Sequence, residues 1–561
     1  MKMNGAEILI RMLEMRGVTM IAGIPGGANL PLYNALYASP IRHILARHEQ
    51  GAGFIAHGMV RSTGRAAVCF ATSGPGATNL ITAIADAKLD SVPLVAITGQ
   101  VPRSMIGTDA FQEVNTCGMT MNLTKHNYLV MDARDLLRVI PEAFAIAESG
   151  RPGPVVIDIP KDVQTEEVEF DAWPEFAAAH DNAPVDGRVI QLMASAINAA
   201  KRPVIYAGGG IICANASALL AEMARKNSIP VALTLMGLGA FPPDDPLYLG
   251  MLGMHGSSFT NHLLDDADLI IALGARFDDR AVGKVAEFCP AASILHVDID
   301  DSEIDKIRKS NISLAADVGV VLEALVPLLE HNDRSDWMAG MGRLKSELAA
   351  AQEGAGDPRN PKEILRRMSK IAADDAIICT DVGQHQMWVA QHYPFRHPRT
   401  LLTSGGLGTM GFGFPAAIGA ALANPGRQVI CVSGDGSFQM NIQELATLAE
   451  LKLNVIVLIM NNQHLGLVRQ QQELFFGGNY IASRFENRVD FAAIARGYGI
   501  RSVNLGAEKN PAVAVMELLK FGGPCVIDAP IHYEENVFPM VPPGAANREM
   551  IGAAVPVSRA V

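Results

Sequence analysis

The sequence predicts an α/β fold of three doubly wound parallel-sheet domains. At 561 residues the chain is too long for a single hydrophobic core. Short apolar segments rich in Val, Ile, Leu and Ala alternate with helical stretches, as expected of parallel strands buried on both faces. Two polar stretches of low periodicity, roughly 167–187 and 352–361, divide this pattern into three parts and are predicted to be linkers.

The predicted domains span residues 1–166, 188–345 and 360–540, and 541–561 form a tail of little periodicity. An amphipathic helix is expected over Met1–Arg16. The buried strands expected in the three domains are, in order, Val18–Ala22, Ile41–Ala46, Ala66–Ala71, Pro93–Thr98 and Pro154–Ile159; then Pro203–Ala207, Ile229–Leu233, Leu269–Leu273 and Ile294–Ile299; then Ala376–Thr380, Gln428–Val432, Val455–Met460 and Pro524–Pro530.

Composition excludes several classes of protein. Apolar residues make up 49% and charged residues 19%, which argues against disorder. The net charge of −12, without any basic run, argues against a nucleic-acid partner. The 7 cysteines are scattered without a CxxC pair, so we expect reduced core residues in a cytoplasmic protein. No apolar run approaches the roughly 20 residues that span a bilayer.

The stretch from Val429 to Leu467 carries the strongest chemical signal. An apolar strand ends at Gly434-Asp435-Gly436, a helical stretch follows, and a second apolar strand ends at Asn461-Asn462. Parallel strands of such a unit meet at one sheet edge, where α/β proteins bind ligands. Asp435 and Asn462 would there offer oxygens suited to Mg2+, and Ser437 begins a helix whose N–H groups attract anions. A tight turn plus a loop amide is the plainer alternative.

Other glycine-rich loops are weaker candidates for a nucleotide site. The segment Gly406–Gly411 matches GxGxxG, but no apolar strand directly precedes it, as a dinucleotide site requires. The turn at Gly208–Gly210 follows a strand, and is compatible either with a nucleotide or with an ordinary strand-to-helix turn. Neither loop carries the lysine of a P-loop.

Gly434-Asp435-Gly436 followed by Asn461-Asn462 resembles the thiamine diphosphate (ThDP) motif of the ThDP-dependent decarboxylases and carboligases. This resemblance implies that Asp435, Asn462 and the backbone carbonyl of His464 hold the Mg2+ that anchors the cofactor's diphosphate. Glu49, in Arg47-His48-Glu49-Gln50-Gly51, matches the glutamate that hydrogen-bonds N1′ of the aminopyrimidine ring. On composition alone Glu49 would be a helix cap. Met410 resembles the large apolar residue that keeps ThDP bent, although alone it would be assigned to the core.

Nearly the whole chain resembles the catalytic subunits of the acetohydroxyacid synthase (acetolactate synthase) family, with the bacterial isozyme I type nearest. The segments that carry this resemblance are Gly23–Tyr33, Arg47–Met59, Thr72–Leu80, Thr98–Glu113, Arg151–Gln164, Leu252–Gly256, Gly274–Arg280, Asp381–Trp388 and Thr403–Ala420. The resemblance implies decarboxylation of pyruvate and transfer of the two-carbon unit to pyruvate or 2-ketobutyrate. These reactions begin branched-chain amino-acid biosynthesis.

Further residue roles follow from the same matches. The diphosphate side would include Gly383, Gln384, His385, Gly408, Gly436 and Ser437, and the cofactor would also contact Gly466 and Leu467. The pyrimidine side would include Pro25, Thr72, Pro75 and Asn79, and the reacting centre or its entrance Gly27, Phe111, Gln112 and Lys161. The first domain would thus bind the pyrimidine and the third the diphosphate and Mg2+. The central domain would bind FAD, through Arg151, Gly208, Gly209, Met254, His255, Arg276, Asp278 and Arg280.

One position departs from the family pattern. Where most relatives carry a tryptophan nine residues after the metal-binding asparagine, this chain has Gln471. A polar side chain offers less apolar contact to the extra methyl group of 2-ketobutyrate, and one methylene in a pocket is worth only about 1–3 kcal/mol. We therefore expect weak discrimination between acceptors, with acetolactate as the main product.

The resemblance also implies assembly. Family members place the active site between the first domain of one subunit and the third domain of another, so a homodimer or a dimer of dimers is expected, together with a small regulatory subunit. The rival interpretations are another FAD-containing ThDP enzyme, such as pyruvate oxidase or glyoxylate carboligase, and a non-catalytic nucleotide-binding scaffold. Glu49 speaks against glyoxylate carboligase, which lacks that glutamate.

Overall fold

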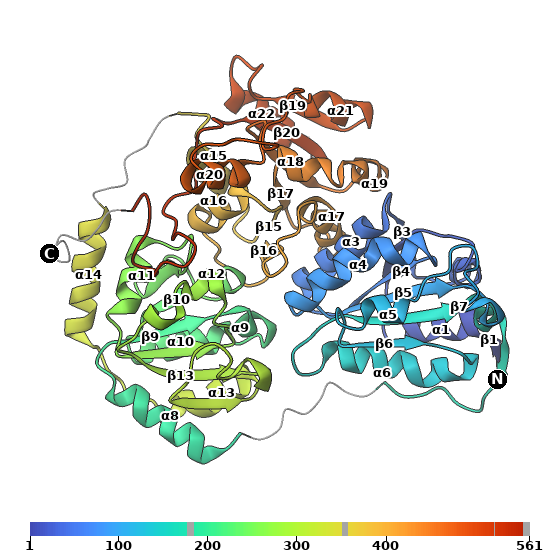
Figure 1. Cartoon of the computed structure of the whole chain (residues 1–561), viewed down its shortest axis with the longest axis horizontal. Coiled ribbons are helices and arrows are strands. Elements are labelled where there is room, and N and C mark those ends of the chain that lie inside the picture. The colour runs from blue at the N-terminus through green and yellow to red at the C-terminus, as the bar shows by residue number, and fades with distance from the viewer. Residues whose placement is uncertain (177–184, 350–356, 521, 554–561) are drawn as a thin grey trace.

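The computed structural model describes residues 1–176, 185–349, 357–520 and 522–553. Three six-stranded sheets, each entirely parallel, form the centres of three α/β units, which Figure 1 shows in blue to cyan, green, and yellow-orange to red. The predicted fold class is therefore confirmed. Outside these sheets, β1 (Lys2–Asn4) pairs antiparallel with β8 (Glu167–Glu169) and joins the two ends of the first unit. The amphipathic N-terminal helix consequently starts later than predicted, at Gly5.

The first sheet has the strand order β3-β2-β4-β5-β7-β6. Its apolar strands β4, β5 and β7 are buried along their whole length between helices on both faces. The elements are α1 (Gly5–Met15), β2 (Met20–Gly23), α2 (Leu30–Tyr37), β3 (Arg42–Leu45), α3 (Glu49–Thr63), β4 (Ala67–Ala71), α4 (Pro75–Leu89), β5 (Leu94–Gln100), α5 (Thr116–Thr120), β6 (His126–Leu129), α6 (Leu136–Glu148), β7 (Val155–Pro160) and α7 (Lys161–Thr165).

The second sheet has the order β11-β10-β9-β12-β13-β14. Strands β9 and β12 lie at its centre and are buried throughout. The elements are α8 (Gly187–Ala199), β9 (Pro203–Ala207), α9 (Gly209–Cys213), α10 (Ser217–Lys226), β10 (Val231–Leu233), β11 (Tyr248–Met251), α11 (Ser258–Asp265), β12 (Leu269–Leu273), α12 (Asp279–Val282), β13 (Ser293–Asp298), β14 (Ile312–Ala315), α13 (Val318–Leu325) and α14 (Ser335–Ala349).

The third sheet has the order β16-β15-β17-β18-β20-β19, so the two strands of the Val429–Leu467 stretch are neighbours. The elements are α15 (Pro361–Ile371), β15 (Ile377–Thr380), α16 (Gln384–His392), β16 (Leu401–Leu402), α17 (Gly413–Ala423), β17 (Val429–Gly434), α18 (Asp435–Gln439), η7 (Ile442–Glu444), α19 (Leu445–Leu451), β18 (Val455–Asn461), α20 (Gly466–Phe475), α21 (Phe491–Gly497), β19 (Arg501–Asn504), α22 (Pro511–Lys520) and β20 (Cys525–Pro530).

Within the three six-stranded sheets, the five described strands that the sequence analysis did not predict all lie at an edge. They are β6, β11, β14, β16 and β19. An edge strand pairs on one side only, and β6, β14 and β19 are mostly exposed or half-buried, so their sequences lack a buried apolar run. The cysteines are free, as predicted, but Cys213 is exposed and is not the core residue that we expected.

The first and third units share a hydrophobic core along α3 and α17. Ile55 and Met59 of α3 pack in one buried cluster with Phe414 and Ile418 of α17, and the two helices lie side by side in Figure 1. Their backbones approach so closely that a Cβ on Gly58 would overlap the carbonyl oxygen of Ala416. Glycine is therefore required at this crossing.

The tail that follows β20 crosses to the second unit. The N–H of Val541 donates to the carbonyl of Met254 (2.8 Å), and Nδ2 of Asn547 donates to the carbonyl of Ala281 (2.8 Å). Figure 1 shows this dark red segment running over the green unit. The described part of the tail therefore joins the third unit to the second.

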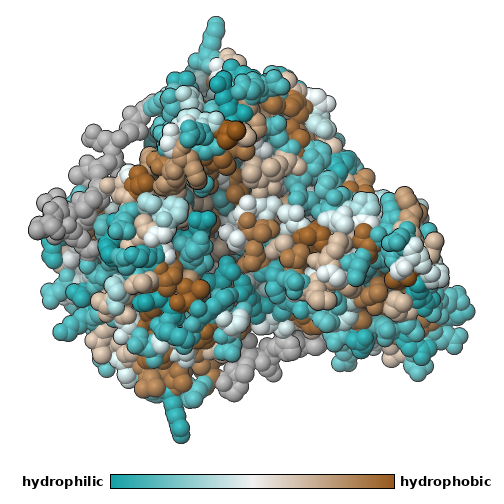
Figure 2. All heavy atoms as spheres, in the orientation of Figure 1, coloured by the Kyte–Doolittle hydropathy of each residue, from teal (hydrophilic) through white to brown (hydrophobic). Residues whose placement is uncertain are grey.

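No helix in the described ranges is long and apolar enough to cross a membrane. On the face drawn in Figure 2, the brown apolar patches are separated by polar side chains.

A Gly58→Ala substitution tests the crossing of α3 and α17. The added methyl group has no space, so we expect destabilisation of about 1–3 kcal/mol and a lower midpoint of thermal unfolding. Gly497→Ala is the matched control, because its Cβ meets nothing within 4 Å. An unchanged midpoint for Gly58→Ala would contradict the close approach.

Candidate active site

The carboxyl edge of the third sheet gathers the polar groups of the Asp435–Asn462 motif. Strands β17 and β18 pair in register, with Gly434 opposite Met460, so both chains leave the sheet at one place. Asp435 starts α18 and is 3% exposed, and Asn462 directly follows β18. Burial raises the pKa of Asp435 to about 7, although backbone N–H groups, including that of Asn462, partly offset this effect.

Gln384, at the start of α16, ties this edge together. Its Oε1 accepts a hydrogen bond from Nδ2 of Asn462 (3.2 Å), and its Nε2 donates to Oε1 of Gln470 (3.0 Å). Oδ1 of Asn462 accepts from the N–H of His464 (3.1 Å). A Cβ on Gly466 would overlap Oε1 of Gln384 and lie 2.6 Å from Nδ2 of Asn462. The glycine therefore lets α20, which also carries Leu467, approach these amides.

His385 leaves a polar atom unpaired at the same edge. Its ring packs against Gly434, where a Cβ would lie 2.9 Å from Nδ1, while the buried Nε2 has no hydrogen-bond partner. Burial lowers the pKa of His385 to about 3, so the ring is neutral near pH 7. Gly383, with φ +148°, turns the chain into α16, and Ser437 Oγ donates to the carbonyl of Val382 (2.8 Å). This nitrogen has no protein partner among the described residues and is available to a polar group of a ligand.

At the first sheet, Glu49 occupies the first turn of α3. The helix is capped by His48, whose side chain accepts from the N–H of Gln50, so Glu49 is not itself the cap. Nδ2 of Asn79 on α4 donates to Oε2 of Glu49 (2.9 Å). A Cβ on Gly76 would touch both Thr72 and Oε1 of Glu49. The carboxyl group is half-buried at the carboxyl edge of this sheet, beside the loop that follows β4.

The remaining first-unit candidates border the same edge. Thr72 contacts the turn that includes Gly27, and exposed Pro25 belongs to that turn. Exposed Pro75 starts α4.

The loop that follows β5 passes beside them. Gln112 has φ +61° and lies against Gly74, where a Cβ would meet its Cα at 2.9 Å. Phe111 is 87% exposed. Lys161 starts α7 directly after β7, next to Asp162, which accepts from Nε of Arg103 (2.7 Å).

The loop that carries Gly408 and Met410 is fixed by carboxylates. Asp90 on the first unit accepts hydrogen bonds from the backbone N–H groups of Gly405 (2.9 Å) and Gly406 (2.7 Å). Asp381, just after β15, accepts from the N–H of Gly411 (2.7 Å). Burial raises the pKa of Asp381 to about 6. Met410 is half-buried between these anchors.

The carboxyl edge of the second sheet brings together most of the residues predicted to bind a flavin. Gly208 follows β9 and packs so closely on Gly274 that no Cβ fits. The N–H of Met254 donates to the carbonyl of Arg280 (2.7 Å), and Nη1 of Arg280 lies 3.5 Å from Sδ of Met254.

The other residues predicted to bind a flavin lie at the same edge, and one of them has an unpaired nitrogen. Asp278 caps α12 by accepting from the N–H of Arg280 (3.0 Å), and Tyr206 donates to the carbonyl of Arg276 (2.5 Å). Gly209 starts α9. His255 is 9% exposed, its Nδ1 has no partner, and burial, followed by the nearby Arg280 charge, lowers its pKa to about 4.

Arg151 lies between the first and second units. Its Nη1 contacts Glu303 (2.8 Å) and Asp300 (3.1 Å), and Nε donates to Oγ of Ser91 (2.9 Å). The arginine therefore forms an ion pair across the two units at the carboxyl end of β13. This pairing was not anticipated from the sequence.

Known proteins match the chain over nearly its full length. Three domain models match: the N-terminal TPP binding domain of thiamine pyrophosphate enzymes over residues 3–119, their central domain over 190–325, and their C-terminal TPP binding domain over 381–529. The large subunit of acetolactate synthase isozyme 1 from Escherichia coli (strain K12) is 54% identical over 98% of both chains.

This chain belongs to the acetolactate synthase family of thiamine pyrophosphate enzymes.

Two further acetolactate synthases are similar to the chain. The isozyme 2 large subunit from E. coli (strain K12) is 44% identical over 98% of this chain and 99% of that one. The chloroplastic acetolactate synthase 1 of Zea mays is 45% identical over 98% of this chain and 88% of its own length. These matches confirm the resemblance drawn from the sequence and do not favour the alternatives. In this acetolactate synthase family member, ThDP-binding domains form the first and third units.

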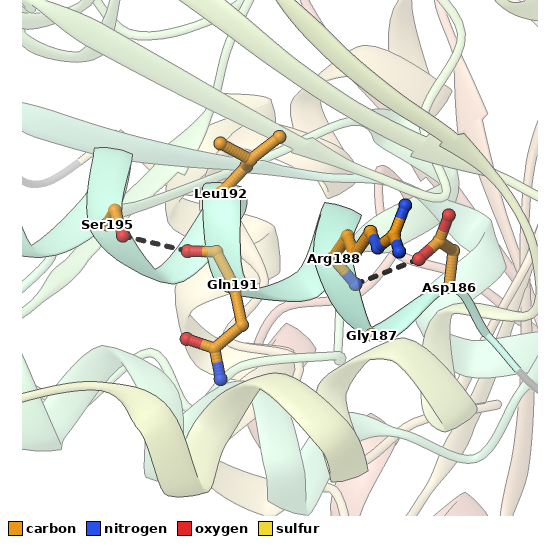
Figure 3. Close-up of a pocket in the computed structure, with 6 residues that line it drawn as sticks. All are labelled: Asp186, Gly187, Arg188, Gln191, Leu192 and Ser195. Atoms are coloured by element: carbon orange, nitrogen blue, oxygen red, sulfur yellow. Dashed lines mark hydrogen bonds between the residues drawn. The ribbon is translucent and has the colours of Figure 1, made fainter.

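A surface depression of about 700 Å³ lies elsewhere, along α8. Figure 3 shows its lining, in which Asp186 accepts a hydrogen bond from the N–H of Arg188 (2.8 Å), and Leu192 and Gln191 point in opposite directions. All of these residues come from one helix and the residue before it. The depression has no convergent polar groups, so it is not the candidate site.

Sequence reasoning missed the carboxylates that hold the site loops. Asp158, on β7, accepts from Oγ1 of Thr98 (2.7 Å) and from Nε2 of Gln100 (2.9 Å), and Gln100 also donates to the carbonyl of Val114 (2.7 Å). This network anchors the loop that carries Phe111 and Gln112. An acidic residue inside the otherwise apolar strand Val155–Pro160 was the available signal.

The Asp158 network predicts a pH dependence of stability. Burial raises the pKa of Asp158 to about 7, above its value in the unfolded chain, so folding favours the protonated form. The contribution of Asp158 to the free energy of unfolding is fully present below about pH 4 and is lost as the pH rises towards 7. The total loss is about 4 kcal/mol at most.

Denaturant unfolding of wild type and Asp158→Asn at pH 5 and pH 8 tests this expectation. The variant, which resembles the protonated acid, should lose less stability than wild type between these two pH values. Equal losses would contradict the assignment of a neutral Asp158 to the folded state.

Proposed function

We propose that this protein is an acetolactate synthase catalytic subunit. It would decarboxylate pyruvate and join the two-carbon unit to a second 2-keto acid, giving 2-acetolactate from pyruvate or 2-aceto-2-hydroxybutyrate from 2-ketobutyrate. This reaction is the first common step of branched-chain amino-acid biosynthesis. The observation that carries the proposal is the 54% identity over 98% of the chain, together with Glu49 and Asp435 at the edges of two ThDP-binding domains.

The diphosphate and Mg2+ would bind at the third sheet. Asp435, Asn462 and the backbone carbonyl of His464 supply the oxygens. Within the described ranges no three His, Cys, Asp or Glu side chains form a metal cluster. The three oxygens from Asp435, Asn462 and His464 suit Mg2+, because this ion completes its octahedron with waters and phosphate oxygens. The unpaired Nε2 of buried His385 supports a polar ligand at this edge. Gly383, Gln384, Gly408, Gly436, Ser437, Gly466 and Leu467 would line it.

When bound, ThDP supplies the carbon nucleophile and accepts the electron pair released by decarboxylation. Glu49 would hold a proton at the ring nitrogen N1′, and Asn79 keeps this carboxyl oriented through its 2.9 Å hydrogen bond. Pro25, Thr72 and Pro75 would border the ring.

The remaining candidates would shape the reacting centre. Met410 would support the bent cofactor, and Gln112 would donate its amide N–H to a ketone or carboxylate oxygen. Gly27, Phe111 and Lys161 would border the entrance.

FAD would bind at the second sheet, where the family resemblance assigns it. The unpaired Nδ1 of His255 and the close-packed Gly208 turn fit a bound polar ligand there. Gly209, Met254, Arg276, Asp278 and Arg280 would contribute to the same site, and Arg151 would border it. Because acetolactate formation is redox-neutral, a structural role for the flavin is sufficient.

The assembly is also part of the proposal. We infer a homodimer or a dimer of dimers, in which Glu49 of one subunit serves the cofactor held by Asp435 of another. A small regulatory subunit would bind in addition, since the relatives at 54% and 44% identity are named large subunits. The domain limits would be 1–166, 188–345 and 360–540, with 541–561 as the tail, and the protein would act in the cytoplasm.

The proposal predicts that Glu49→Gln lowers acetolactate formation from pyruvate at least about 100-fold, because the amide cannot share a proton with N1′. Product is measured as acetoin after acid decarboxylation, with ThDP, Mg2+ and FAD omitted in turn. Omission of ThDP or Mg2+ should abolish activity. Oxygen uptake in proportion to pyruvate would instead identify an oxidase, and full activity of Glu49→Gln would refute the proposed role.

Gln471 provides a test of acceptor choice. It is exposed on α20, five residues after the start of that helix at Gly466. In an equimolar mixture of pyruvate and 2-ketobutyrate, we expect wild type to show little preference, and Gln471→Trp to favour 2-ketobutyrate by about 10-fold or more through apolar contact with its methyl group. Val468→Ala, a change on the same helix, is the control. Strong enrichment of acetohydroxybutyrate by the wild type would contradict this assignment.

A further inference from the structure

Glu444 is a buried carboxyl group of the third unit that contacts the first turn of the helix carrying Glu49. It ends η7, is 0% exposed, and lies in the chain nine residues after Asp435. Its Oε1 accepts a hydrogen bond from the backbone N–H of Arg47 (2.9 Å). Its Oε2 accepts from Oγ1 of Thr447 (2.6 Å). The carboxyl group of the third unit therefore accepts a hydrogen bond from the first unit, at a position two residues before Glu49 in the chain.

The packing around Glu444 is close. A Cβ on Gly51 would lie 2.5 Å from Oε1 of Glu444, so the glycine lets the first turn of α3 rest on this carboxyl group without displacing it. Burial raises the pKa of Glu444, while the N–H groups of Arg47 and His48 partly offset the effect. A carboxylate at a helix N-terminus is also favoured by the helix dipole.

Asn441 makes a second contact from the same segment. Its side chain is 1% exposed, and Nδ2 donates to Oε1 of Gln50 (3.1 Å) and to the carbonyl of Gly411 (2.7 Å). One amide therefore joins the residue after Glu49 to the residue after Met410. Residues on both sides of Glu49 are thus held by third-unit side chains.

We propose that Glu444 is a positioning residue for Glu49, with Asn441 as its partner. The two side chains fix the backbone at Arg47 and the side chain at Gln50, so the intervening Glu49 leaves the helix in one direction. This inference rests on the proposed function of Glu49. Because reacting groups tolerate little misplacement, loss of the contact should lower turnover rather than the binding of substrate.

The chain contains a matched control on the next helix. Glu450 of α19 also contacts Arg47, but it pairs with the arginine side chain (2.6 Å). The side chain of Glu450 is 60% exposed. Glu450→Ala removes a surface ion pair between the same two units and leaves the backbone of α3 untouched, so it should change activity and amide exchange little.

The first measurement is amide hydrogen exchange of peptides covering residues 45–54, without added cofactor. Glu444→Ala should accelerate exchange at Arg47 by about 10-fold or more, because it removes the acceptor of that N–H group. Glu444→Gln keeps an acceptor oxygen and should remain within about 3-fold of wild type. Unchanged exchange in Glu444→Ala would overturn the proposed contact, and this result does not depend on the role of Glu49.

The second measurement is steady-state kinetics on pyruvate. Glu444→Ala should lower kcat by about 100-fold with KM within about 3-fold, and Glu444→Gln should recover most of the loss. A fall only in the unfolding midpoint, or equal defects in both variants, would overturn the positioning role. If Glu49→Gln is fully active, the proposed function fails instead, and the exchange result still decides the contact.

Discussion

The close contact between helices α3 and α17 is the constraint on which the candidate site depends. Gly58 and Gly419 bring the two helix backbones together, because neither position has space for a Cβ atom. The apolar side chains around this crossing belong to one buried cluster shared by the first and third units. The contact fixes α3, and with it the backbone at Glu49, against the third unit of the same chain. A shift of one helix would move the carboxyl group away from its place.

Polar contacts extend this arrangement towards the site. Asp90 of the first unit holds the loop that leads to Met410, and Glu444 of the third unit holds the backbone that leads to Glu49. Each unit thus fixes a candidate site element of the other. Buried carboxylates suit this purpose, since leaving them or the N–H groups they bind without partners would cost free energy.

The sequence predicted the central parts of the fold better than its edges. Strands such as Ala67–Ala71 and Val455–Asn461 are buried on both faces, so their apolar runs are unmistakable. Edge strands such as Ile312–Ala315 pair on one side only, and solvent exposure removes the apolar run that would reveal them. The sequence analysis predicted parallel strands in the Val429–Leu467 stretch but no strand order, because local sequence does not encode which strands are neighbours.

The same division applies to the candidate site. The positions of Asp435, Asn462 and Glu49 at the sheet edges were predictable, because each directly follows a strand or starts a helix in a recognisable motif. Asp158, Asp381 and Glu444 were not, because their partners lie far away in the chain. Arg47, for example, is 397 residues from Glu444. Such contacts depend on the packing of complete units, which short motifs do not report.

In the proposed active site, carboxyl groups from two ThDP-binding domains act on one cofactor, and these domains belong to different subunits. Mixing inactive Glu49→Gln and Asp435→Asn proteins under conditions of subunit exchange tests this arrangement most directly. In a mixed dimer, one site would carry both substitutions and the other neither. Activity should therefore return, up to about a quarter of the wild-type value for random mixing. If each site is built from a single chain, every site keeps one defect, and no activity would return.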